Sequence, residues 1–86
     1  MNEQYRLLFA DRVYDDLEKI HPKVANQLLK KIDLLKTFPF LGKTTESGYW
    51  RGYQFITDNY RILYTINETN KTVNVYHIRH GKMYFH

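Results

Sequence analysis

Apolar and polar residues alternate through residues 60–66, and this alternation restricts the fold more than any other feature of the chain. The residues that fall on one face of an extended strand are Tyr60, Ile62, Tyr64 and Ile66. Arg61 falls on the other face, because side chains in a strand point alternately to its two sides. A turn at residues 68–71 and a second strand pattern at 72–79 follow. The sequence therefore predicts a hairpin with one packed face and with Arg61 on the opposite face.

The N-terminal half carries one strand pattern and two helical patterns. Residues 5–9 read as a strand, and Asp11 is the expected N-cap of a first helix that ends at His21-Pro22. The apolar positions expected on one stripe of that helix are Val13, Leu17 and Ile20. Pro22 suits the first position of a second helix. Its apolar stripe comprises Val24, Leu28, Ile32 and Leu35. The two helices are predicted to form a hairpin with a shared apolar side.

The second half is predicted to be mainly strands. Residues 43–48 are polar and read as an exposed loop, 49–56 read as an aromatic-rich strand, and Asp58-Asn59 reads as a turn. The predicted fold class is α+β: an N-terminal strand, a two-helix hairpin and then antiparallel strands, with the helices on one face of the sheet. The pattern does not identify the neighbour of the first strand. At 86 residues, the chain is predicted to be a single domain, 1–86.

Composition narrows the function classes. The chain has no cysteine, which excludes disulfides and thiol nucleophiles and suits the cytoplasm. No apolar run has the length of a membrane span, and the first residues lack the pattern of a secretory leader, so a cytoplasmic location is expected. The four histidines lack metal-site spacing. We therefore expect no cofactor and no metal.

Positive charge is concentrated in the strand half. The net charge is +4; residues 1–48 hold eight Lys and Arg against seven Asp and Glu, whereas 49–86 hold five against two and three of the four histidines. Such an excess favours RNA, DNA or an acidic protein as the partner.

The segment Tyr60-Arg61-Ile62-Leu63-Tyr64, a short turn and a strand that ends Ile78-Arg79-His80-Gly81-Lys82 together resemble the RelE/ParE superfamily of toxins from toxin-antitoxin pairs. The likeness extends over nearly the whole chain in the order of its elements. It implies the same α+β layout and a cognate antitoxin, whose acidic or amphipathic segment is expected to cover Arg61 or wrap the helices.

The resemblance also implies a set of site residues for RNA cleavage. The positions expected to be catalytic are Arg61, His80, Lys82, Tyr84 and His86, and those expected to bind RNA are Arg51 and Arg79. Arg61 corresponds to an arginine that binds the scissile phosphate, a task suited to a guanidinium that donates two parallel hydrogen bonds. Its other expected partners are Glu68, Asp58 or an antitoxin carboxylate. His77 is expected to be a packed or hydrogen-bonded strand residue.

Three functions are compatible with this resemblance. The first is a metal-independent mRNA endonuclease that acts on messages in the ribosome and arrests translation. The second is an inhibitor of DNA gyrase, as in ParE. It is favoured by the stretch Gly52-Tyr53-Gln54, which lacks the lysines that family ribonucleases often carry before the Tyr-Arg-Ile strand. The third is a non-catalytic RNA- or protein-binding domain on the same scaffold.

Overall fold

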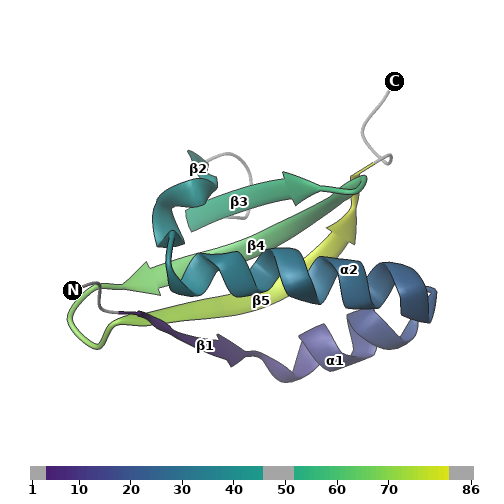
Figure 1. The fold of residues 1–86 in the computed structure, drawn as a ribbon, viewed down its shortest axis with the longest axis horizontal. Coiled ribbons are helices and arrows are strands. Elements are labelled where there is room, and N and C mark those ends of the chain that lie inside the picture. The colour runs from purple at the N-terminus through teal and green to yellow at the C-terminus, as the bar shows by residue number, and fades with distance from the viewer. Residues whose placement is uncertain (1–3, 46–51, 82–86) are drawn as a thin grey trace.

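The computed structural model describes residues 4–45 and 52–81, and its elements follow the predicted order (Figure 1). The main elements are β1 Arg6–Phe9, α1 Asp11–Glu18, α2 Pro22–Asp33, β2 Lys43–Thr45, β3 Gly52–Thr57, β4 Tyr60–Asn67 and β5 Thr72–His80. Two 3₁₀ helices, η1 Leu34–Lys36 and η2 Pro39–Leu41, lie between α2 and β2. Within the described ranges, no helix combines the length and the apolar character needed to cross a membrane. The predicted α+β class is confirmed.

The five strands form one sheet in the order β1-β5-β4-β3-β2. β2 to β5 pair in antiparallel fashion, but β1 pairs in parallel with β5, which places the first and last strands side by side (Figure 1). The sheet is therefore mixed, whereas the sequence patterns indicated antiparallel strands and left the neighbour of the first strand open. A β-bulge between Leu63 and Tyr64 shifts the β4–β5 register by one residue at Tyr76.

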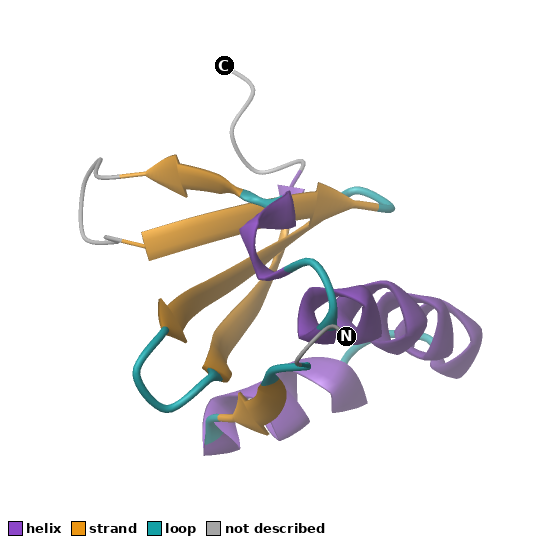
Figure 2. Ribbon diagram, turned by 60° about the vertical axis from the view of Figure 1, so that its left-hand side comes forward, coloured by secondary structure: helices purple, strands orange, loops and turns teal. Residues whose placement is uncertain are grey.

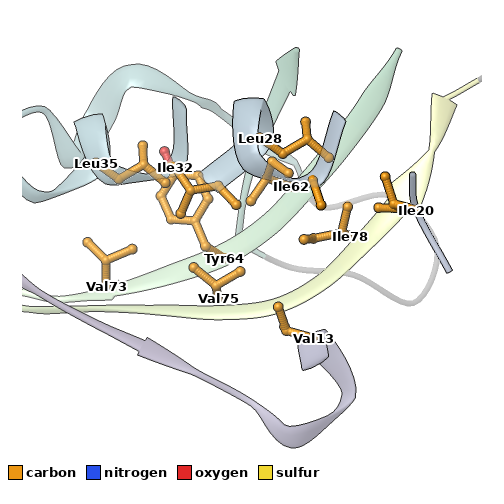
Figure 3. Packing of buried hydrophobic residues seen from close by; sticks show 11 residues of the cluster. Val13, Ile20, Leu28, Ile32, Leu35, Ile62, Tyr64, Val73, Val75 and Ile78 are labelled. Carbon is orange, nitrogen blue, oxygen red and sulfur yellow. The ribbon is translucent and has the colours of Figure 1, made fainter. Parts of the chain in front are cut away.

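Both helices cover the same face of this sheet (Figure 2). The side chains that meet between the layers come from α1 and the turn after it, from α2 and η1, and from β4 and β5 (Figure 3). They include Val13, Ile20, Leu28, Ile32, Leu35, Ile62, Tyr64, Val73, Val75 and Ile78. The predicted helix stripes therefore face the predicted apolar face of β4, and burial of these side chains is the main source of stability.

Tyr64 extends the core toward the segment between α2 and β2. Its side chain is fully buried, and its ring stacks on Tyr53 at 5.3 Å between centroids. The Tyr64 hydroxyl donates to the carbonyl of Pro39 at 2.8 Å and accepts from the backbone N–H of Gly42 at 2.9 Å. A side chain at position 42 would collide with this hydroxyl, since a Cβ there would lie 2.7 Å from it. One buried tyrosine thus holds η2 and the start of β2 against the sheet.

The predicted turn at Asp58-Asn59 is confirmed and fixes the register of β3 and β4. Both residues have positive φ, 53° and 67°, as a two-residue type I′ hairpin requires. The carbonyl of Asn59 also accepts from the N–H of Gly81 at 2.6 Å. A Cβ at position 81 would lie 3.0 Å from that carbonyl oxygen, so Gly81 permits the end of β5 to lie close to the turn.

Three local predictions were wrong. Residues 43–45 form β2 rather than a loop, because β3 lies alongside and supplies their backbone partners, and polar Lys and Thr suit an edge strand. Ala10, not Asp11, is the N-cap of α1, since its N–H donates to the carbonyl of Val75 and keeps it extended. Asp11 is the first helical residue, where its carboxylate still suits the helix dipole. α1 ends at Glu18, so Ile20 is buried from the turn that follows.

Candidate functional site

The face of the sheet that the helices leave uncovered carries a pair of arginines. Arg61 on β4 is directly opposite Arg79 on β5, one residue from the end of each strand. Both are partly buried. Like charges at directly opposite positions destabilise a strand pair, and an anion between two guanidinium groups removes this cost. The pair is therefore a candidate site for a phosphate or a carboxylate.

The register extends this basic face across the sheet. On β3, Gln54 accepts a hydrogen bond from Arg61 Nη1 through its Oε1 at 2.9 Å, which orients the guanidinium toward β3. Lys43 on β2 is directly opposite Gln54 and shares its face, because partners across antiparallel strands point to the same side. Arg79, Arg61 and Lys43 thus place three cations along one face, on β5, β4 and β2.

His80 lies on the other face. It is directly opposite Tyr60, whose neighbours Ile62 and Tyr64 belong to the core, so its ring is on the helix side of the sheet. The His80 and Tyr60 rings meet edge to face, 4.9 Å apart at 82°. The structure brings Arg61 and Arg79 together but separates His80 from them by the thickness of the sheet. The other predicted site residues, Arg51, Lys82, Tyr84 and His86, lie outside the described residues.

His77 joins β5 to α1, which confirms the expectation of a hydrogen-bonded strand residue. Asp16 Oδ2 lies 2.7 Å from His77 Nδ1 and accepts from the backbone N–H of Ile78 at 3.0 Å. β1 pairs with β5 only as far as Val75, so Asp16 covers the edge of β5 beyond that point. A carboxylate thus closes the sheet edge next to the candidate site.

We expect Asp16→Ala to lower the free energy of unfolding by about 2 kcal/mol, because the partly buried Ile78 N–H and His77 ring lose a charged acceptor. Denaturant unfolding measures the loss. Asp15→Ala is the matched control, since Asp15 is the neighbouring exposed carboxylate of the same helix. Equal stabilities of the two variants would contradict a structural role for Asp16.

A groove lies between β1, at the edge of the sheet, and the second half of α2. Its volume is about 700 Å³. Its apolar lining comes from Tyr5, Leu7, Phe9 and Leu29. Its charged residues are Arg6, Lys36 and Asp33, of which Lys36 and Asp33 form an ion pair at 2.9 Å. Leu29 is 37% exposed although it lies on a helix that packs on the core. The groove therefore offers an amphipathic segment both apolar contacts and the positive charge of Arg6.

A second apolar surface is formed by residues 38–41. Phe38, Phe40 and Leu41 are about half exposed, whereas Pro39 between them is buried. Phe40 contacts Tyr53 edge to face at 5.9 Å between centroids, and the Tyr64 hydroxyl holds the backbone on either side. These residues line a hollow of about 400 Å³. We refer to residues 38–41 as the apolar knob; its backbone is held in place before any partner binds.

Local sequence reasoning missed Lys43 and the role of Gln54. Lys43 was assigned to a loop, and no local pattern indicates otherwise, because β2 exists through its pairing with β3. Gln54 was noted only for the absence of a lysine. The alternation of residues 52–57 did contain a signal, since it places Gln54 on the face opposite Tyr53 and Phe55, which pack on the core.

Residues 7–85 match the sequence model of the family described as the ParE toxin of type II toxin-antitoxin systems. A search of the curated proteins gives no match.

The fold is similar to that of several toxins in solved complexes. The toxin-antitoxin complex RelBE2 from Mycobacterium tuberculosis matches with a TM-score of 0.80 and 24% identity over 90% of this chain and 98% of that chain. The archaeal RelE-RelB complex from Pyrococcus horikoshii gives 0.78 and 19% over 93% and 98%. The intact E. coli RelBE complex gives 0.69 and 24% over 88% and 95%. At these identities the similarity concerns the fold.

Proposed function

Because the chain belongs to the ParE toxin family of type II toxin-antitoxin systems, we propose that it arrests growth by cutting mRNA. The proposed activity is that of a ribosome-dependent endonuclease in the cytoplasm. The observation that carries the proposal is the Arg61–Arg79 pair on the open face of the sheet. Two arginines at directly opposite strand positions on one face suit the recognition of a phosphate in an RNA strand, since each guanidinium can donate two parallel hydrogen bonds.

In the proposed reaction, the 2′-hydroxyl of the RNA attacks the adjacent phosphorus, a 2′,3′-cyclic phosphate forms and the 5′-oxygen leaves with a proton. Arg61 and Arg79 stabilise the negative charge that develops on the phosphorane oxygens. The attacking hydroxyl needs a base and the leaving oxygen needs an acid. RNA supplies its own nucleophile, so the scheme includes no metal.

We assign the proton-transfer roles to Lys82, Tyr84 and His86. The chain leaves β5 next to the arginine pair and the Asn59 carbonyl at Gly81, immediately before these residues. His80, on the helix side of the sheet, is a poor candidate for direct proton transfer at a phosphate bound to Arg61. This assignment combines the residues that the family resemblance implies with the register of β4 and β5.

Mapping of mRNA 5′ ends after induction tests the proposal. We expect new ends within reading frames that appear within minutes of induction and disappear in the Arg61→Ala strain. A gyrase supercoiling assay with the purified protein runs in parallel. Inhibited supercoiling without new mRNA ends would overturn the endonuclease proposal.

Inhibition of DNA gyrase is the second candidate function, and the apolar knob is the observation that favours it. RNA binding depends mainly on basic and stacking groups, whereas large apolar side chains on a fixed backbone are typical of contacts with a protein. Phe38 and Phe40 are each more than half exposed. If gyrase is the target, Phe38→Ser should weaken inhibition of supercoiling more than Arg61→Ala does.

We also propose that a cognate antitoxin neutralises the protein by laying an amphipathic segment in the groove between β1 and α2. Two of the similar complexes contain a RelE toxin with its RelB antitoxin. In the present chain the groove combines apolar Leu29 with basic Arg6, which suits a helix or strand with an apolar side and an acidic flank. Such segments often fold on binding.

Co-expression with a short reading frame beside the gene is expected to restore growth and to yield a complex that copurifies. Leu29→Arg should weaken that complex at least tenfold, since it places an unpaired charge in an apolar contact. Leu41→Arg is the control, because Leu41 is also an exposed leucine, at 47% against 37% for Leu29, and lies outside the groove. Two proteins that purify separately, with no rescue of growth, would exclude this antitoxin.

A further inference from the structure

A small cavity on the helix side of the sheet contains His80. Its volume is about 290 Å³, and it lies between the C-terminal turn of α1 and the adjoining ends of β4 and β5. The lining residues are Asp16, Lys19, Ile20, Tyr60, Ile78 and His80. Buried Ile20 and Ile78 are apolar, and Lys19 is exposed, so a buried apolar surface lies next to a solvated cation.

The two aromatic rings of this cavity form a corner. The planes of Tyr60 and His80 meet at 82° with centroids 4.9 Å apart. A flat ring that stacks on one of them directs its edge at the other, so a single ring can contact both. The Asp16 carboxylate is held by His77 and by the Ile78 N–H, which offsets its charge toward an anionic ligand. Lys19 adds a cation for a phosphate.

The cavity and the arginine pair lie near the same end of the sheet, on its opposite faces. The Tyr60–His80 pair is the row directly next to the Arg61–Arg79 pair, about 3.3 Å further along the strands and on the opposite face. Beyond it, the sheet ends at the Asn59–Gly81 contact. A single strand of RNA that passes over this end therefore reaches both faces within a short length.

We propose that this cavity binds one nucleotide of an RNA strand, with its base against Tyr60 and His80 and its phosphate near Lys19. The inference rests on the proposed endonuclease function and deepens it, because it assigns a subsite for a nucleotide that flanks the cleaved bond. Single-stranded RNA is bound in this manner, by aromatic side chains that stack on bases beside cations that contact phosphates. In this role His80 positions substrate and does not transfer a proton.

A binding experiment with the full-length protein tests the proposal without depending on cleavage. The four 5′-nucleoside monophosphates are titrated separately, with ribose 5-phosphate and inorganic phosphate as probes that lack a base, and amide and aromatic NMR signals are followed. We expect at least one nucleotide to shift the signals of Tyr60, Ile78 and His80. His80→Ala should weaken its binding on the order of tenfold, and His80→Phe should restore most of it, since a stacking surface returns.

Matched variants locate the site. Lys19→Ala should weaken nucleotide binding severalfold, whereas Lys23→Ala, an exposed lysine outside the cavity, should not. Arg61→Ala should leave binding at the cavity unchanged, because Arg61 is on the other face. Equal shifts with ribose 5-phosphate would overturn the base contact. Nucleotides that shift only the signals of Arg61 and Arg79 would overturn the site. It would also be overturned if the signals of Tyr60 and His80 shifted on addition of the antitoxin but with none of the nucleotides.

Nucleotide binding and the proposed cleavage can fail separately. New mRNA ends without nucleotide shifts at Tyr60 and His80 would refute the subsite and leave the endonuclease proposal intact. Nucleotide shifts at the cavity of a protein that makes no mRNA cuts would refute the endonuclease and, with it, the flanking role of the subsite. Support for the inference requires both the shifts and an altered pattern of cut sequences in the His80→Ala strain.

Discussion

Arg61→Ala is expected to abolish growth arrest and to reduce mRNA cleavage about a hundredfold, which corresponds to about 3 kcal/mol of transition-state stabilisation. The physical reason is the place of Arg61 in the fold. It faces away from the core, Gln54 on β3 fixes the orientation of its guanidinium, and Arg79 lies directly opposite it on β5. Initial rates of cleavage with purified protein and programmed ribosomes measure the effect.

Two further variants separate charge from geometry. Arg61→Lys keeps the positive charge but loses the planar pair of donors, so we expect it to recover only part of the activity. Arg12→Ala is the control, because it removes an exposed arginine from α1, on the side of the sheet that carries the helices. The far-UV spectrum and the antitoxin complex should be retained in all three. A folded Arg61→Ala protein that cuts mRNA at the wild-type rate would remove Arg61 from the site.

Tyr64→Ala is expected to produce the largest loss of stability, about 4 kcal/mol in the free energy of unfolding. The substitution leaves a cavity at a fully buried position and removes the two hydrogen bonds that join Pro39 and Gly42 to the sheet. Such a loss is a large part of the total stability of a small domain. Urea unfolding measures it, with Tyr14→Ala, a tyrosine that is 56% exposed, as the control. Similar losses for the two variants would contradict the anchoring role.

Tyr64→Phe isolates the hydroxyl. We expect a loss of about 2 kcal/mol at neutral pH, because the Pro39 carbonyl and the Gly42 N–H lose their partner. Burial raises the pKa of Tyr64 above its ordinary value of 10.0, against the opposing effect of the hydrogen bond from Gly42. In the unfolded chain the hydroxyl ionises first, so its contribution to stability is complete below pH 10 and declines as the pH rises further.

Unfolding curves for wild type and Tyr64→Phe between pH 7 and pH 11 test this linkage. The difference in stability between the two proteins should be constant up to about pH 9 and should narrow above pH 10. A difference that stays constant through pH 11 would show that the hydroxyl has the same pKa in the folded and unfolded states.

Sequence patterns were reliable where a segment has one apolar face. The spacing of Leu28, Ile32 and Leu35 predicted the buried stripe of α2 and η1, and the alternation from Tyr60 onward predicted the packed face of β4. Each pattern reflects a physical requirement that acts within the segment, because burial of one face fixes the period of apolar residues. The same alternation placed Arg61 on the open face, which the register confirms.

The candidate site was only partly predictable. Arg61 and Arg79 were both identified from the strands that carry them, but their opposition depends on the β4–β5 register and on the bulge at Tyr76. His80 was grouped with Arg61 because the family resemblance implies that both are catalytic. The register places them on opposite faces, since a shift of one residue along a strand reverses the side to which a side chain points.

The sequence by itself determined the identity and order of β1, the two helices and β3 to β5, the apolar stripes of the helices and the polar face of β4. The tertiary structure decided the parallel pairing of β1 with β5, the existence of β2, the position of Lys43 beside Gln54 and the separation of His80 from Arg61. The first group depends on neighbours along the chain, whose spacing is written in the sequence. The second depends on backbone hydrogen bonds and registers between distant segments, which exist only after the core has brought those segments together.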